Sequence, residues 1–408
     1  MSASARILII SNGALCRNPR VLKEATTLGL AGHDVTVLTV RNHPPSEQHD
    51  LRILLDAPFR RKTVDTAAGV SADRLRPLYR RMVHKIARTM VSRLHFETAS
   101  ALGPAGPLLN AARQIPSDLV IVHNEVAHWV GTRLIKEGRR VCADIEDWHS
   151  EDLLPDQQSA RPLGLIRNTE RTLLHHAVHT TTTSHALADA LHERYGGHRP
   201  CVITNSFPLQ PDPDMGSTGD SPSFFWFSQT LGPGRGLELF MAAWKLTTMP
   251  SRLVLLGETS DDYAQRLLAG LPPDRQRLVS FLPLVSPDEL PAVIARHDIG
   301  LALEQAFIPN RNLTITNKIL QYLNAGLAVV ASDTAGQCEV LSHAPDAGII
   351  VQSHETTGFA RQLDDLLADR EALFRRRRAA RLIAQTLYCW EKEAPRLLGL
   401  ASHALSKT

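Results

Sequence analysis

Short apolar runs alternate with helical segments along nearly the whole chain, and this alternation limits the folds open to it. The amino-terminal part shows the pattern, with an apolar strand predicted at residues 6–10, a helix at 19–31 and a second strand at 34–40. Strands that are separated by helices pair in parallel and have both faces of their sheet covered. The sequence therefore predicts an α/β protein with mainly parallel sheets.

A proline-rich stretch interrupts the alternation once. Residues 207–223 contain four prolines and two glycines among small polar residues, which is a linker composition. Apolar runs then resume at 224–227, 253–256, 278–282, 299–303, 328–331 and 348–351. We expect an N-terminal domain at 1–207, a linker at 208–223, a C-terminal domain at 224–387 and a terminal segment at 388–408.

Composition excludes several classes of protein. The chain has 408 residues, 43% apolar content and a net charge of +3, which are ordinary for a globular protein. The five cysteines are scattered without a Cys-x-x-Cys pair, so we expect reduced thiols and neither a disulfide framework nor a zinc site. The first apolar run is too short for a signal peptide, and no run could span a bilayer. We expect a cytoplasmic protein, either soluble or peripheral on the inner face of the membrane.

The segment from Thr316 to Ser332 is the most specific local pattern. It predicts a helix capped by Thr316 or Asn317, a glycine stop at Gly326 and a buried strand at 328–331. A helix start presents free backbone N–H groups and a partial positive charge, which favour a diphosphate. Lys318 adds a formal charge at this predicted anion site.

Residues 317–332 follow the pattern Asn-Lys-x-x-x-Tyr-x-x-x-Gly-x-x-Val-Val-x-Ser, and this resembles the nucleotide-sugar segment of GT-B glycosyltransferases of family 4. Residues 18–25 and 32–38 look like the opening of the same family. The resemblance implies two Rossmann-like parallel-sheet domains that face each other across a cleft, a UDP- or GDP-linked sugar donor and retention at the anomeric carbon. It implies neither a cofactor nor a metal ion. The pair Trp390-Glu391 resembles the start of a terminal helix that crosses back to the first domain.

The resemblance assigns the donor mainly to the second domain. Arg235 lies in a glycine-rich loop after a strand, where a guanidinium can bind a diphosphate bidentately. Thr230 occupies the place of the family's other cation, and Gln321 that of its ribose-binding glutamate. Leu313 stands where the family has a second glutamate. The expected donor-binding residues are Gly13, Arg235, Glu258, Phe281, Thr316, Asn317, Lys318 and Gln321.

Polar residues that follow strands of the first domain are the candidates for the acceptor side. His123 follows the strand at 119–122, where many GT-B transferases have a histidine near the sugar. Glu146 and Asp147 fall where some relatives have a His-Glu pair. The expected catalytic residues are His123, Asp147 and Glu304, and the expected acceptor-binding residues are Arg20, Asn124 and Glu146. The alternatives are a strand-end histidine bonded to backbone, a solvated acidic helix start and a surface salt bridge of Glu304.

A basic region lies between Arg60 and Arg93, with ten Arg or Lys residues against two acidic ones. Part of it predicts an amphipathic helix with apolar residues from Tyr79 to Leu94. This helix could lie on an anionic membrane surface, which would make residues 60–95 a membrane contact, or it could pack on the first domain. The region lacks interleaved stacking aromatics, so we expect no nucleic-acid partner.

We therefore predict a glycosyltransferase that acts on a glycan, a lipid-linked or a small-molecule acceptor. Two other functions stay open. One is a nucleotide-sugar epimerase of GT-B fold, which would convert the donor without an acceptor. The other is a non-catalytic relative that binds nucleotide sugar or a partner enzyme, and Leu313, Gln321 and Thr230 favour it.

Overall fold

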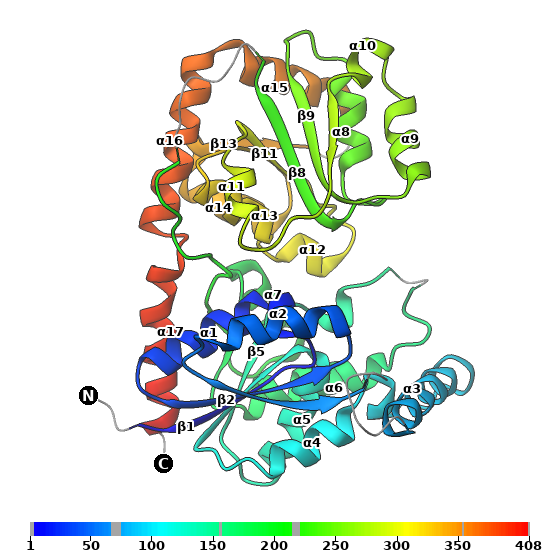
Figure 1. The fold of residues 1–408 in the computed structure, drawn as a ribbon, viewed down its shortest axis with the longest axis vertical. Coiled ribbons are helices and arrows are strands. Elements are labelled where there is room, and N and C mark those ends of the chain that lie inside the picture. Colours follow the sequence, from blue (N-terminus) through cyan, green and yellow to red (C-terminus); the bar gives the residue numbers. More distant parts are fainter. Residues whose placement is uncertain (1–3, 67–74, 155–156, 214–220, 353–354, 407–408) are drawn as a thin grey trace. The chain divides into compact units, whose positions relative to one another are not determined.

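The computed structural model describes residues 4–66, 75–154, 157–213, 221–352 and 355–406. The chain forms two compact units, one of residues up to Ile203 together with those from Ala394, and one of Thr204–Glu393 (Figure 1). Part of the linker predicted at 208–223 lies outside the described residues.

The first unit is built on a seven-stranded sheet in the order β3-β2-β1-β4-β5-β6-β7. All neighbouring strands pair in parallel, as the alternation predicts. The strands are β1 (Arg6–Ile10), β2 (Asp34–Arg41), β3 (Arg60–Asp65), β4 (Leu119–His123), β5 (Val141–Ile145), β6 (Thr180–Thr182) and β7 (Cys201–Val202).

Helices cover both faces of this sheet. Two separate apolar clusters lie against it, one under α4, α5 and α6 and the other under α1 and α17. In the second cluster Ala401 and Ala404 of α17 pack with Ile7 and Leu119 of the central strands. The helices are α1 (Pro19–Leu30), α2 (Pro44–Leu54), α3 (Leu75–Leu94), α4 (Ala105–Arg113), α5 (Asn124–Lys136), α6 (Leu163–His176), α7 (His185–Tyr195) and α17 (Trp390–Ser406).

The second unit has a six-stranded parallel sheet in the order β10-β9-β8-β11-β12-β13. Its strands are β8 (Ser223–Thr230), β9 (Arg252–Glu258), β10 (Val279–Leu282), β11 (Ile299–Ala302), β12 (Ala328–Ser332) and β13 (Gly348–Val351). Its helices are α8 (Leu237–Trp244), α9 (Asp261–Ala269), α10 (Pro273–Gln276), α11 (Leu290–Ile294), α12 (Pro309–Leu313), α13 (Asn317–Asn324), α14 (Ala335–His343), α15 (Thr356–Ala368) and α16 (Arg370–Thr386). The sheet is again covered on both faces by apolar clusters.

The helix and strand predicted at Thr316–Ser332 are confirmed as α13 and β12. The Thr316 hydroxyl accepts a hydrogen bond from the Ile319 N–H and so caps the helix. Gly326 has φ of 69°, the left-handed conformation that follows many helix ends. Tyr322 is fully buried in the core under the sheet, which fixes the orientation of α13.

The basic region divides into two elements that differ in their surroundings. Residues 60–65 form the edge strand β3, in which Arg60 and Lys62 are exposed and Arg61 is half-buried. Arg61 of β3 pairs with Glu47 and with Asp50 of α2, at 2.7 Å for the Asp50 carboxylate. The carboxylates of α2 therefore neutralise cations that the sequence had grouped with the amphipathic helix α3.

Candidate active site

The carboxyl ends of the strands in the second unit bring most of the predicted donor residues to one edge of the sheet. In open parallel sheets this edge is where ligands bind. The loop at 232–236 follows β8, Glu258 ends β9, Phe281 lies near the end of β10 and Glu304 follows β11. The start of α13 belongs to the same edge, because α13 leads into β12 and packs on β11 (Figure 1).

The glycine-rich loop at 232–236 contains one arginine and is contacted by a second. Arg235 belongs to the loop, is half-buried and forms no ion pair with any described residue. Arg311 of α12 donates from Nη1 to the carbonyl oxygen of Gly234 at 3.1 Å. Gly236 has φ of 78°, and a Cβ there would lie 2.8 Å from the Leu303 Cβ. The loop can therefore pass close to β11 only with glycine at this position.

Lys318 and Glu304, predicted in different roles, form a buried pair. The Lys318 ammonium donates to the Glu304 carboxylate at 2.9 Å and lies 5.2 Å from the centre of the Trp226 ring. Both side chains are at most one-tenth exposed. The pair has no net charge, so Lys318 alone is not the strong cation that the sequence suggested. Arg235 and Arg311 supply the positive charge at this edge.

The start of α13 keeps polar groups available. Asn317 is exposed, and its side-chain oxygen accepts a hydrogen bond from Asn205 at 2.9 Å. Gln321, one turn further on, is half-buried, and its side chain forms no hydrogen bond with any described residue. A ligand at the helix start would meet the N–H groups of the first turn, with the Gln321 amide in the next turn.

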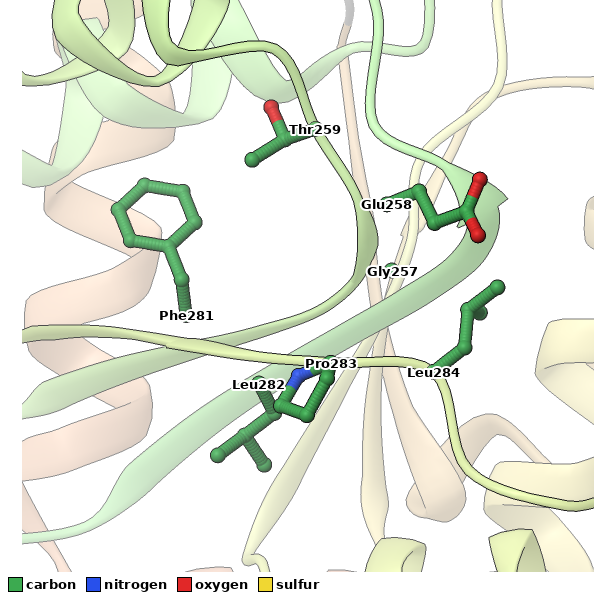
Figure 2. Close-up of a pocket in the computed structure, with 7 residues that line it drawn as sticks. All are labelled: Gly257, Glu258, Thr259, Phe281, Leu282, Pro283 and Leu284. Atoms are coloured by element: carbon green, nitrogen blue, oxygen red, sulfur yellow. The ribbon is translucent and has the colours of Figure 1, made fainter.

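A cavity of about 460 Å³ lies at the ends of β9 and β10. Figure 2 shows its lining, with Glu258 and Leu284 on one side and Phe281 on the other. Gly257, Thr259, Leu282 and Pro283 complete the lining. The aromatic ring and its apolar neighbours suit a flat heterocycle, and the carboxylate suits hydroxyl groups on a substituent of that heterocycle.

In the first unit, Arg20 is committed to partners within the protein. Its guanidinium forms a bidentate pair with Asp144, at 2.7 Å for Nη2, and Nη1 donates to the Ile203 carbonyl at 2.7 Å. Arg20 and Asp144 are both almost completely buried. The arginine opposes the burial of the Asp144 carboxylate and keeps its pKa far below the ordinary value. Arg20 therefore holds the Asp144 carboxylate in place, and its predicted contact with an acceptor stays a prediction.

His123 is buried at the end of β4 between two carboxylates. Its Nε2–H donates to Glu24 of α1, and Nδ1 lies 3.1 Å from Asp144. Burial alone lowers the pKa of an imidazole, but the Glu24 and Asp144 carboxylates outweigh it and raise the pKa of His123 to about 10. His123 is thus an imidazolium at neutral pH with both nitrogens facing protein carboxylates. Through these carboxylates His123 links the end of β4 to α1 and β5.

The loop after β1 is tied to the start of α5. Asn124 adopts φ of 69°, and its side-chain oxygen accepts hydrogen bonds from the Ser11 hydroxyl at 2.8 Å and the Asn12 N–H at 3.4 Å. Gly13 follows in this loop with open space where a side chain would be. Asn124 therefore shapes the loop, while Gly13 leaves its surface accessible to a ligand.

The acidic loop after β5 contains the one predicted group whose pKa lies near neutrality. Burial and the neighbouring Asp147 carboxylate raise the pKa of Glu146 to about 7. Burial lowers the pKa of His149, but a hydrogen bond to Asp152 and the Asp147 charge raise it to about 9. Glu146 and Asp147 are half-buried, so this loop can exchange a proton with a bound hydroxyl group.

Sequence reasoning missed Glu24, Asp144 and Arg311. Asp144 is a charged residue inside an otherwise apolar strand, and that signal could have marked it as paired. Glu24 and Arg311 carry no comparable signal, because their partners are 99 and 77 positions away in the chain.

The described residues contain neither a metal-binding cluster nor a membrane-spanning helix. No cluster of three or more His, Cys, Asp or Glu side chains in these residues is arranged to hold a metal ion. None of the helices in the described ranges combines the length and the apolar character needed to cross a bilayer.

Residues 222–369 match the family model described as glycosyl transferases group 1. This match coincides with the second unit, where the glycine-rich loop, the cavity and the start of α13 lie. No curated protein matches the chain.

Solved structures resemble the whole chain. Sucrose-phosphate synthase from Thermosynechococcus elongatus has a TM-score of 0.71 at 15% identity, covering 99% of this chain and 100% of that one. HepE from Anabaena in complex with UDP-glucose has a TM-score of 0.69 at 16% identity, covering 98% and 99%. α,α-Trehalose 6-phosphate synthase from Burkholderia multivorans has a TM-score of 0.67 at 12% identity, covering 99% and 100%.

The chain has the GT-B fold. Identities of 12–16% establish this architecture and do not carry the substrates of those proteins over to this chain.

Proposed function

We propose that the protein is a glycosyltransferase that moves a sugar from a UDP- or GDP-linked donor to a glycan, a lipid-linked or a small-molecule acceptor. One observation carries this proposal: the glycine-rich loop contains Arg235 and accepts a hydrogen bond from Arg311, on the same sheet edge as the first turn of α13 and the cavity beside Phe281. The family-model match over residues 222–369 and the HepE structure with UDP-glucose support a nucleotide-sugar donor.

The parts of the donor correspond to parts of this edge. The nucleobase occupies the cavity beside Phe281, and the ribose hydroxyls bind Glu258 and Gln321. The diphosphate lies at the start of α13, where Thr316 fixes the first turn, with Arg235 and Arg311 around it. Lys318 uses one of its three N–H donors on Glu304 and can give another to the diphosphate.

Charge stabilisation is the main catalytic effect in this proposal. When the bond between the anomeric carbon and the diphosphate oxygen breaks, negative charge grows on the leaving group, and the two arginines stabilise it. The acceptor oxygen forms the new bond, and its proton passes to the carboxylate of Asp147 or Glu146 or to the leaving phosphate. We propose retention at the anomeric carbon, with Glu304 near the transferred sugar and Gly13 in the loop that contacts the donor.

We propose that the reaction needs no metal ion, because the two arginines supply the cationic charge at the diphosphate. We also place the activity in the cytoplasm. All five cysteines are free thiols, which fits a reducing compartment.

Glu304 also supports a second candidate, a non-catalytic protein that binds nucleotide sugar. Its carboxylate is occupied by Lys318, and Leu313 provides no carboxylate in α12. An epimerase of the same fold is the third candidate and needs a base and an acid around a free sugar nucleotide.

One assay separates the three candidates. The purified chain is incubated with UDP-, GDP-, ADP- and TDP-sugars, with and without a panel of glycan and lipid-linked acceptors, and each donor is followed by chromatography. A transferase releases nucleoside diphosphate in an acceptor-dependent manner, at a rate that a chelator leaves unchanged. Conversion of the donor into an isomer without acceptor would indicate the epimerase, and binding without any turnover would indicate the non-catalytic protein. The variant Arg235→Gln is the control, and it should abolish both donor binding and the release of nucleoside diphosphate.

A further inference from the structure

The helix α3 exposes an apolar face that no described part of the chain covers. The side chains of Leu78, Tyr79, Met82 and Ile86 are between 51% and 64% exposed. They fall within a 100° arc of the helix, since each residue advances the helix by about 100°. Large apolar side chains exposed in one contiguous stripe mark an interaction surface.

The opposite side of α3 holds the helix on the first unit. Ala87 and Val91 are buried and pack with Ala101 in a small apolar cluster. His84 bonds the Ser100 carbonyl oxygen at 2.8 Å, and Arg80 bonds the Asp65 carbonyl oxygen. Figure 1 shows α3 apart from the strands of its unit. The helix is therefore packed on the first unit through one side, and the exposed stripe is its solvent-facing side.

Cations lie beside the apolar stripe. Arg81, Lys85 and Arg88 are exposed along one margin, and Arg93 lies near the carboxyl end of the helix. Residues 75–96 contain six Arg or Lys residues and no Asp or Glu. Among the described residues, none of these four cations has a carboxylate partner. The surface combines exposed apolar groups with unneutralised positive charge.

We propose that α3 binds an anionic lipid surface, lying in the interface with Leu78, Tyr79, Met82 and Ile86 inserted between the headgroups. The positive charge of this face distinguishes between two possible partners, a second copy of α3 and an anionic lipid surface. A second copy of α3 would bring two sets of cations together, whereas anionic headgroups satisfy the cations while the acyl boundary covers the apolar stripe. This binding goes beyond the proposed transfer reaction and does not depend on which donor is used.

The structure also narrows the surface that the sequence predicted. Val83 and Met90 are half-buried, and β3 belongs to the sheet with Arg61 neutralised by α2. Among the described residues of 60–95, the exposed arc of α3 is where apolar side chains and cations lie together, and the proposal is confined to this arc.

Vesicle co-sedimentation of the full chain tests the proposal. The vesicles contain either phosphatidylcholine alone or phosphatidylcholine with 30% phosphatidylglycerol. We expect binding to the anionic vesicles that weakens as salt rises, and little binding to the neutral ones. Arg81→Gln/Lys85→Gln/Arg88→Gln should weaken partitioning about a hundredfold, since each cation contributes a factor of roughly five. Met82→Ser/Ile86→Ser should also lower it at least tenfold.

Matched controls change similar groups elsewhere. Leu30→Ser/Leu55→Ser removes two side chains that are 75% and 81% exposed, and Arg361→Gln/Arg375→Gln/Arg378→Gln removes three exposed cations. Neither control should change binding by more than about twofold. Equal binding to both vesicle types, or equal losses in controls and α3 variants, would overturn the proposal. So would absence of vesicle binding together with a concentration-dependent dimer that the α3 apolar variant disrupts.

Discussion

At the scale of residues, the first unit contains a buried cluster whose charges balance. The cations Arg20 and His123 face the carboxylates of Asp144 and Glu24, and all four side chains are buried. Isolated charges would be expensive in this environment, so each one depends on the others. The cluster joins β4 and β5 to α1, beside the start of α5 at Asn124 and the loop that carries Glu146.

Removing the central carboxylate should therefore destabilise the fold. We expect Asp144→Asn to lower the free energy of unfolding by about 3–5 kcal/mol, because it leaves two cations with one buried carboxylate. Asp189→Asn is the control, since its pair with Arg199 is largely exposed and should cost less than about 1 kcal/mol. Urea denaturation measures both variants. Similar small losses for the two would contradict a coupled buried cluster.

Glu146 should make stability depend on pH. Its pKa is raised from 4.5 to about 7, so between these values the unfolded chain ionises while the folded carboxyl keeps its proton. The contribution of Glu146 to the free energy of unfolding is fully present below pH 4.5 and is lost as pH rises through about 7. The total loss is at most about 3 kcal/mol. Glu146→Gln cannot ionise and should remove this part of the decline.

Denaturation of both proteins at pH 5, 6 and 7.5 tests this expectation. The variant should gain stability relative to the unmodified chain as pH rises, with Asp261→Asn, an exposed carboxylate in the second unit, as the control. Parallel pH curves for Glu146→Gln and the unmodified chain would show that Glu146 does not titrate in this range.

At the scale of elements, the glycine-rich loop determines how Arg235 is presented. Gly236 has a left-handed backbone and lies against Leu303, whereas Gly232 has open space where a side chain would go. The two glycines thus differ in what a methyl group would meet, although they lie in one loop.

The substitution Gly236→Ala should distort this loop. The left-handed conformation costs an alanine about 1–2 kcal/mol, and the new Cβ would also collide with Leu303. We expect lower thermal stability together with weaker binding of nucleoside diphosphate. Gly232→Ala, the matched control, should change neither by more than about 0.5 kcal/mol. Equal effects of the two substitutions in calorimetric titrations would contradict this account of the loop.

Helices and strands were predictable from the sequence where the apolar periodicity and the capping residues indicated the same element. The α13–β12 segment was predicted nearly residue by residue, because Thr316, the apolar face and Gly326 all indicate the same helix. The strand β3 was missed because an edge strand needs few apolar residues, and its cations resembled a surface run. The ion pairs of His123 and Arg20 join residues 99 and 124 positions apart in the chain, and no local pattern specifies them. The pair of Lys318 with Glu304 spans 14 positions and joins a helix start to a strand end.

At the scale of the whole molecule, the two parallel-sheet units differ in the chemistry of the edges where ligands bind. This difference agrees with the proposal that one unit binds the donor and the other binds the acceptor. The second unit presents Arg235 and Arg311 at the glycine-rich loop together with a cavity, which suits a nucleotide diphosphate. The first unit presents an acidic loop with a group that titrates near neutrality, which suits acceptor hydroxyl groups. The two parallel-sheet units were predictable from the alternation and its single break, which follow from apolar periodicity. The GT-B architecture itself was predicted from the resemblance of residues 317–332 to a known family.

Calorimetric titration of UDP, GDP, ADP and TDP, each compared with its parent nucleoside, tests the central claim that the second unit binds the diphosphate through Arg235 and Arg311. The account predicts that one diphosphate binds at least a hundredfold more tightly than its nucleoside, since each charge-assisted hydrogen bond contributes about 1.5–3 kcal/mol. In Arg235→Gln/Arg311→Gln most of that difference should disappear while the nucleoside still binds. Equal affinities for diphosphate and nucleoside, or an unchanged preference in the double variant, would contradict the claim.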